Sequence, residues 1–220
     1  MNLIYGASTV KDGNMSFRWG EEGIVNSNRK RFLGRLGLKI EDCVFTSLNH
    51  GADIMEVGSK DKGRTVECDA IVTDEPGVVL FMLTADCFPV VVCDEEKVAL
   101  VHLGYQGVWK KLIQKVARKF GKDARVVIGP GVRKESYVFE TVEQANDPEW
   151  KPFLEKVPGG VSVDLVGYIK KQVNNLKVED CGIDTAKDLN YFSHYRSVRI
   201  GEPEGRFATI AALYWSYSSR

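Results

Sequence analysis

Three short apolar runs stand close together at the centre of the chain, at residues 78–83, 89–93 and 98–101. Each run is rich in β-branched residues and has almost no polar interruption. Strands buried on both faces have this composition, whereas strands with one face in water alternate between apolar and polar residues. Whatever fold the chain adopts must therefore cover its central strands with further layers on both sides.

The flanking segments predict how those layers are supplied. The polar residues 94–97 predict a turn that joins the second and third runs as a hairpin. Apolar residues recur at helical spacing over 108–120, where Gly121 would cap the C-terminus, and again over 163–176, where Ser162 would be the N-cap. The other expected elements are a helix over 28–36, strands over 44–48, 124–128 and 207–213, and a long loop over 140–160.

The organisation of the chain predicts one domain. No repeat and no low-complexity linker divides the 220 residues, and a chain of this length can bury a large core. With more strand than helix expected, we predict an α/β or α+β fold in a single domain over residues 1–220, with helices covering the sheet.

Composition excludes several classes of partner. Lysine plus arginine and aspartate plus glutamate both number 30, so the formal net charge is +0 and gives no general attraction to nucleic acid or to an anionic membrane. The five cysteines are odd in number and show no CxxC spacing, which favours reduced thiols. The first residues lack the features of a signal peptide, and the most apolar stretch, 78–93, is too short to span a bilayer. We therefore expect a cytoplasmic protein.

Histidine limits the possible chemistry, because the chain has only three. Three imidazoles can form one compact metal site or one acid–base pair, but they cannot form several metal centres built mainly on histidine. His50 follows the expected strand 44–48, Cys87 lies between the first two apolar runs, and His102 ends the third. Taken singly, a capping histidine and a small buried thiol are ordinary structural features. All three nevertheless lie at strand ends, where active sites on sheets are assembled.

The segment after His102 contains Gly104 and Gly107 and leads directly into the expected helix. Backbone amides in such a turn can approach an anionic ligand, and the start of a helix favours negative charge. The segment is neither a Walker loop nor a GxGxxG fingerprint, and glycines also occur in tight turns for steric reasons alone. Phosphate binding and simple turn geometry are both open for it.

Seven short segments occur in a fixed order along the chain. They are NHG at 49–51, CDAIVT at 68–73, TADCFP at 84–89, VHLGYQG at 101–107, IGPG at 128–131, FSH at 192–194 and GRF at 205–207. This ordered set resembles the YfiH-like or laccase-domain family, also called the polyphenol oxidase family and now regarded as purine nucleoside phosphorylases. The resemblance covers most of the chain and is densest between His50 and Tyr137.

The resemblance implies a layered α/β/β/α sandwich of mixed sheets covered by helices. It also implies a catalytic zinc bound by His50, Cys87 and His102, with the free fourth position that catalytic zinc sites keep. Copper is the less favoured metal, because a multicopper cluster needs many more imidazoles than three. The implied activities are phosphorolysis of adenosine, inosine, guanosine and methylthioadenosine, and deamination of adenosine. The implied partners are thus a purine nucleoside and phosphate, bound by a monomer or homodimer.

The same motifs provide the other candidate site residues. Asp86 either orients a zinc ligand through a hydrogen bond or caps its own turn. The candidate substrate-binding residues are Gly104, Tyr105, Gln106, His194 and Arg206. Among these, the glycine turn and Arg206 are the candidates for contacting phosphate.

The chain departs from the family next to His102. The family usually has His-Ala-Gly-Trp-Arg-Gly, where this chain has Leu103, Tyr105 and Gln106. If the family's arginine binds phosphate or substrate, glutamine removes a charge and a bidentate donor. A zinc-binding paralogue with altered or lost turnover is therefore one alternative. Another is a cysteine hydrolase such as an amidase, with Cys87 as nucleophile and His102 as base.

Overall fold

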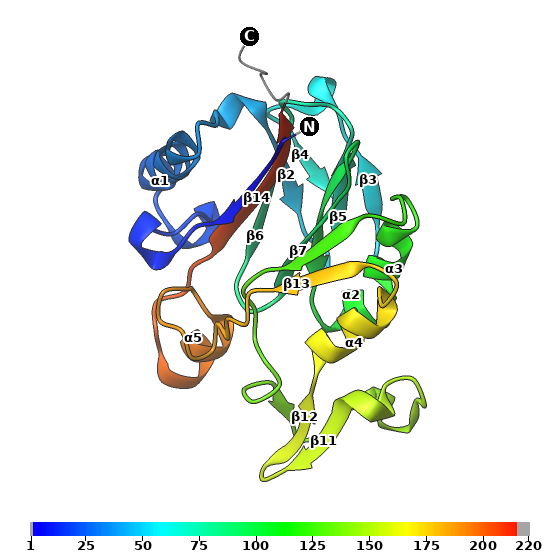
Figure 1. Cartoon of the computed structure of the whole chain (residues 1–220). Coiled ribbons are helices and arrows are strands. Elements are labelled where there is room, and N and C mark those ends of the chain that lie inside the picture. Colours follow the sequence, from blue (N-terminus) through cyan, green and yellow to red (C-terminus); the bar gives the residue numbers. More distant parts are fainter. Residues whose placement is uncertain (1, 215–220) are drawn as a thin grey trace.

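The computed structural model describes residues 2–214, so the expected domain over residues 1–220 extends beyond the described residues at both ends. Two large sheets lie face to face, and helices cover their outer faces (Figure 1). The five-stranded sheet contains, in spatial order, β1 (Asn2–Ala7), β14 (Phe207–Tyr214), β6 (Val79–Thr84), β2 (Cys43–Ser47) and β4 (Thr65–Glu67). The six-stranded sheet contains β13 (Lys177–Asp180), β9 (Arg125–Ile128), β7 (Phe88–Cys93), β8 (Val98–Leu103), β5 (Ala70–Thr73) and β3 (Ile54–Glu56).

The remaining elements are a small sheet and the helices. The small sheet contains β10 (Val138–Phe139), β12 (Gly160–Val163) and β11 (Leu154–Val157). The α-helices are α1 (Glu22–Arg35), α2 (Tyr105–Trp109), α3 (Leu112–Ala117), α4 (Leu165–Gln172) and α5 (His194–Ile200). Short 3₁₀ turns are η1 (Val10–Asp12), η2 (Phe17–Trp19), η3 (Ile40–Asp42), η4 (Ser59–Asp61), η5 (Glu143–Asn146) and η6 (Lys151–Phe153). None of the helices in the described part of the chain has both the length and the apolarity that a membrane crossing requires.

The alternation of side chains along the central strands explains the layers. In β6, Leu80 and Met82 belong to the apolar core between the two sheets, whereas Val79 and Phe81 belong to the core under α1. The central strands of the six-stranded sheet alternate in the same way between that inter-sheet core and a core shared with α2, α3 and α4. Such strands need no polar face, which explains their continuous apolar sequence. The expected fold class, a layered α/β/β/α sandwich with mixed sheets, is confirmed.

Strand pairing brings several strand ends together. β7 and β8 pair antiparallel, as predicted, with Phe88 opposite Leu103. In the other sheet β2 runs parallel to β6, and the end of β6 at Thr84 lies opposite Phe207 at the start of β14. The turn from β6 into β7 passes between the two sheets at this point. The end of β8, the start of β7 and the start of β14 therefore surround one region, which holds the candidate site.

All three expected helices have different bounds in the structure. The helix expected over 28–36 is α1, which begins already at Glu22. The other two differ more. The helix predicted over 108–120 is two short helices, because Lys111 adopts a left-handed backbone with φ 58° and interrupts it. The helix predicted after Ser162 is capped instead by Asp164, whose carboxylate accepts from the backbone N–H of Gly167 at 2.8 Å. Ser162 lies in β12, and its hydroxyl donates to the backbone carbonyl of Lys134. Both errors arise because the apolar stripe marks the buried face of a helix but not its ends.

The segment 140–160, expected as a long loop, contains regular structure. It contains η5, η6 and β11, and the turn at Gly159 and Gly160 joins β11 to β12 as an antiparallel hairpin. Both glycines have positive φ, which suits the reversal. Trp150, with no exposed surface, anchors the segment to the core shared with α4.

Candidate metal centre

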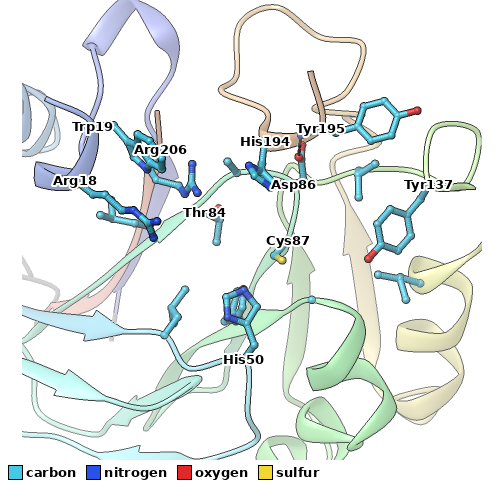
Figure 2. A pocket seen from close by; sticks show the side chains of 17 residues that line it. Arg18, Trp19, His50, Thr84, Asp86, Cys87, Tyr137, His194, Tyr195 and Arg206 are labelled. Carbon is cyan, nitrogen blue, oxygen red and sulfur yellow. Dashed lines mark hydrogen bonds between the residues drawn. The ribbon is translucent and has the colours of Figure 1, made fainter. Parts of the chain in front are cut away.

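His50, Cys87 and His102 come from three different strand ends and meet at one point. His50 lies in the loop after β2, Cys87 in the turn between β6 and β7, and His102 near the end of β8. Each offers one ligand atom, and the three atoms lie within 4.8 Å of one another. Figure 2 shows His50 and Cys87 facing a common cavity. The structure thus brings together the three residues that the sequence motifs single out.

The turns that carry two of these residues have unusual backbones. His50 has φ 59° and Asp86, next to Cys87, has φ 84°. Residues other than glycine rarely adopt positive φ, and such strain persists only where the surrounding contacts impose it. At His50 the contacts come from Asp69, whose carboxylate accepts from the backbone N–H groups of His50 at 3.1 Å and Gly51 at 2.6 Å.

Asp69 also fixes the ring of His102. Nδ1 of His102 lies 2.9 Å from Oδ1 of Asp69, and both residues are buried. A carboxylate is the usual second partner of a metal-binding histidine. It favours the proton on Nδ1 and leaves the lone pair of Nε2 free to bind a metal. One buried carboxylate therefore holds the backbone of one candidate ligand and the imidazole of another.

The sequence reasoning did not assign this role to Asp69. It proposed Asp86, but the Asp86 carboxylate accepts instead from the Thr185 hydroxyl and from the backbone N–H of Tyr195, each at 2.7 Å. Asp86 therefore ties its turn to the start of α5, a contact that differs from both expected roles, orienting a zinc ligand and capping its own turn. Asp69 lies directly before β5, where the pairing of Ala70 with Val101 places residue 69 beside residue 102, and the local sequence gives no signal of this pairing.

The electrostatic environment favours a thiolate at Cys87. Burial by itself raises the pKa of the Cys87 thiol, but the neighbouring imidazoles of His102 and His50 lower the pKa more, to well below its usual range. Burial conversely lowers the pKa of His102, while Cys87 and Asp69 raise it more strongly. A thiolate is the form of cysteine that binds metals and that attacks as a nucleophile.

The donor set fits a single metal ion. One thiolate and two imidazoles match the ligands of catalytic zinc sites, in which metal–ligand distances are about 2.0–2.3 Å and a fourth position stays open. Gly104 leaves room for the thiolate, because a Cβ at residue 104 would lie only 2.8 Å from Sγ of Cys87. Close packing against the thiol thus explains this glycine without a ligand.

The cavity beside the three donors has a volume of about 500 Å³. It is lined by most of the candidate residues, including Asp86, Gly104, His194 and Arg206. Tyr105 and Gln106 are exceptions, since they line a neighbouring hollow on the far side of Tyr137.

Tyr105 contributes to packing. Its ring stacks on Trp150 with 5.0 Å between ring centroids, and its hydroxyl donates to the side chain of Gln144. The family's Trp-Arg pair is therefore replaced at positions that do not face the cavity in this structure.

The wall opposite the three donors was only partly anticipated. Arg206 and His194 lie there, as do Arg18 and Trp19 from η2, which the sequence reasoning did not select (Figure 2). Glu204 links two residues of this wall, because its carboxylate pairs with both Arg206 and His194. Burial raises the pKa of Glu204, but the pairing with Arg206 and His194 lowers it to about 2.

Comparison with known proteins agrees with the motifs. The family model described as multi-copper polyphenol oxidoreductase laccase matches residues 5–214. A purine nucleoside phosphorylase of Mycobacterium tuberculosis is 29% identical over 202 residues, covering 84% of this chain and 78% of that protein. Another, of Xylella fastidiosa, is 28% identical over 220 residues, covering 90% of this chain and 83% of that protein.

Solved structures share the fold. The Bacillus licheniformis hypothetical protein YfiH has a TM-score of 0.82 at 21% identity, covering 96% of this chain and 92% of that chain. YlmD from Geobacillus stearothermophilus also has a TM-score of 0.82, at 23% identity, covering 97% and 92%. Because the family model matches nearly the whole sequence, the chain belongs to the family described as multi-copper polyphenol oxidoreductase laccase, the YfiH-like family that its motifs resemble.

Proposed function

We propose that the chain is a zinc-dependent enzyme that cleaves purine nucleosides with phosphate, and that the same centre deaminates adenosine. The observation that carries the proposal is the convergence of His50, Cys87 and His102 on one cavity. The similarity to proteins named purine nucleoside phosphorylase supports the choice of substrate.

Zinc fits the centre better than a copper cluster does. The chain has three histidines in all, and two of them already belong to this centre, so a multicopper arrangement lacks ligands. When bound, zinc supplies a Lewis acid that polarises a substrate atom or lowers the pKa of a water molecule. Asp69 would keep Nε2 of His102 directed at the metal, and Gly104 would keep the thiolate accessible.

The cavity suits a nucleoside in size and character. Pockets for small ligands have volumes of about 300–1,000 Å³ and combine apolar walls with a few polar groups. Here Leu48, Val132 and Tyr137 provide apolar and aromatic surface, and His194 and Arg206 provide polar groups. Phosphorolysis requires phosphate to be held against the ribose C1′ atom while positive charge develops on the sugar. Deamination requires instead an activated water at the purine ring.

Metal content and product formation test the proposal together. Protein purified without added metal should contain about one zinc per chain. With adenosine and phosphate it should release adenine, and with adenosine alone it should release inosine. Finding neither zinc nor any of adenine, hypoxanthine and inosine would contradict the proposal.

A cysteine hydrolase is the second candidate, and one arrangement favours it. Cys87, His102 and Asp69 form a line of thiol, imidazole and carboxylate, as in nucleophilic triads. Tight zinc binding would occupy the thiolate and count against this reading. Fast iodoacetamide labelling of Cys87 in the metal-free protein, with amide cleavage in the absence of zinc, would favour it, whereas slow labelling would rule it out.

A zinc-binding paralogue without turnover is the third candidate. It rests on the loss of the family's arginine at Gln106, a residue that lines the neighbouring hollow rather than the cavity. This reading predicts zinc but no turnover of any nucleoside, so turnover of one nucleoside would refute it.

A single domain, present as a monomer or homodimer, stays a prediction that light scattering of the purified protein tests.

A further inference from the structure

Two arginines and a tryptophan form the wall of the cavity opposite the metal ligands. The guanidinium carbon of Arg18 lies 4.9 Å from the centroid of the Trp19 ring, and that of Arg206 lies 5.7 Å from it. Both arginines line the cavity, and Figure 2 shows their guanidinium groups directed into it. Cation–π contacts therefore hold both guanidinium groups against one indole. We call Arg18, Trp19 and Arg206 the arginine wall.

The backbone that carries the arginine wall is held from two sides. The side-chain oxygen of Asn14 accepts from the backbone N–H of Arg206, and the backbone N–H of Met15 donates to the carbonyl of Arg206, each at 3.0 Å. From α1, Arg29 donates through Nε and Nη2 to the carbonyl of Met15, at 2.8 and 2.6 Å. The segment leading into Arg18 is thereby fixed against the start of β14. Such support is what a preorganised ligand site requires.

The arginine wall carries positive charge that nothing nearby neutralises in full. Arg206 pairs with Glu204, but Arg18 has no carboxylate within ion-pair distance among residues 2–214. Asp86 is the carboxylate that lines the cavity, and both of its oxygens already accept hydrogen bonds from Thr185 and Tyr195. An anionic group in the cavity would meet the Arg18 guanidinium without displacing an existing ion pair.

Thr84 provides an independent indication at the same place. It ends β6 opposite Phe207, the neighbour of Arg206 in sequence, and it lines the cavity. Its side chain is buried, with 2% of the residue exposed, and within the described chain its hydroxyl has no hydrogen-bond partner. Leaving a buried hydroxyl unpaired costs free energy, which an oxygen atom of a ligand would recover.

We propose that Arg18, Arg206 and Thr84 form a phosphate-binding subsite, in which Trp19 holds the two guanidinium groups in place. Paired arginines suit a tetrahedral dianion, because guanidinium groups donate two parallel hydrogen bonds to phosphate oxygens. The role of this phosphate as co-substrate rests on the proposed phosphorolysis. Free orthophosphate and a phosphoryl group on the nucleoside share this chemistry. The subsite lies in the cavity, whereas Gln106 lines the neighbouring hollow, so the charge of Arg18 does not depend on the residue at position 106.

The test compares Arg18→Gln with Arg64→Gln, a control that removes another exposed arginine, just before β4. Phosphate binding is measured on the zinc-containing protein by calorimetric titration and by the rise in Tm that phosphate causes. Arg18→Gln should weaken phosphate binding about tenfold, as expected for loss of a charge-assisted hydrogen bond. The control, the zinc content and the Tm without phosphate should not change. Arg18→Lys should recover part of the affinity.

Parallel titrations separate the two sources of phosphate and the two proposals. If Arg18→Gln weakens binding of adenosine 5′-monophosphate but not of orthophosphate, the subsite binds a phosphoryl group on the nucleoside; the opposite result assigns it to orthophosphate. Phosphate binding that depends on Arg18, without phosphorolysis, would support the subsite and refute the proposed function. Phosphorolysis with an unchanged phosphate KM in Arg18→Gln, and unchanged binding of both probes, would overturn the subsite and leave the proposed function standing.

Discussion

The two walls of the cavity are built in different ways. The metal-ligand wall, formed by His50, Cys87 and His102, consists of residues at the ends of central strands and is organised by one buried carboxylate, Asp69. The arginine wall comes from a 3₁₀ turn and the start of β14, and its backbone is held by the side chains of Arg29 from α1 and of Asn14. Strand pairing and the Asp69 carboxylate position the first wall. The second depends on a few side-chain contacts, which makes it the part of the site that sequence change can alter at least cost to the fold.

The largest expected effect is at the metal-ligand wall. Cys87→Ser removes the thiolate and should reduce zinc content and turnover at least about 100-fold, since even changes around metal ligands cost 10–100-fold. Cys181→Ser is the matched control, because Cys181 is an exposed free thiol. Elemental analysis and nucleoside turnover measure both variants. Full zinc content in Cys87→Ser would contradict the assignment of the metal site to this wall of the cavity.

Asp69→Asn should have the next largest effect. The amide keeps the shape of the carboxylate, but it loses the charge and one of the two acceptor oxygens. The two oxygens together bind two backbone N–H groups and the ring of His102. Zinc affinity should fall about 10–100-fold. Competition with a chelator measures it, with exposed Asp74→Asn as the control. A zinc affinity equal to that of the control would show that Asp69 does not support the metal ligands.

Asp69 and Asp86 show what the sequence predicts about the site and what it does not. The central strands were predicted because burial on both faces leaves a continuous apolar run, and the three donor residues because they lie in specific motifs. Asp86 was weighed as a support for the ligands because it is adjacent to Cys87 in sequence. Asp69 supports them in the structure because β5 pairs with β8, and that pairing is not visible in the local sequence.

The same reason explains the other differences. The break at Lys111 and the cap at Asp164 depend on local backbone geometry, which an apolar stripe does not report. Arg18 is far from Arg206 in sequence, and only the contacts between η2 and β14 bring them to one indole. Tyr105 is a candidate for substrate binding because it lies in the motif at 101–107, but in the structure its ring stacks on Trp150.

The contribution of Glu204, the partner of Arg206, to the free energy of unfolding should disappear in acid. Pairing with Arg206 holds the folded-state pKa of Glu204 at about 2, below the ordinary value of 4.5. A depressed carboxyl pKa stabilises the fold above pH 4.5, and this stabilisation is lost as the pH falls toward 2. Glu204→Gln should therefore cost about 2 kcal/mol of unfolding free energy at pH 7 and almost nothing near pH 2.

Denaturant unfolding at the two pH values measures this difference. Glu56→Gln serves as the control, because the exposed pair of Glu56 with Lys119 should contribute less than about 1 kcal/mol. Equal losses for Glu204→Gln at pH 7 and pH 2 would show that the carboxylate does not stabilise the wall through its charge.

The smallest effect should come from restoring the family's arginine. Gln106→Arg adds a charge in the hollow beyond Tyr137, so it should change the phosphate KM less than about twofold, compared with about tenfold for Arg18→Gln. Steady-state kinetics with varied phosphate measure both variants. A large gain in phosphate affinity from Gln106→Arg would shift the phosphate site away from the arginine wall.

The zinc X-ray absorption spectrum of the purified protein tests the proposed centre most directly. Coordination by Cys87, His50 and His102 predicts one sulfur neighbour at about 2.3 Å and two imidazole nitrogens at about 2.0–2.1 Å, with a fourth, lighter ligand. A protein without zinc, or with zinc that has no sulfur neighbour, would contradict the assignment of these three residues as its ligands.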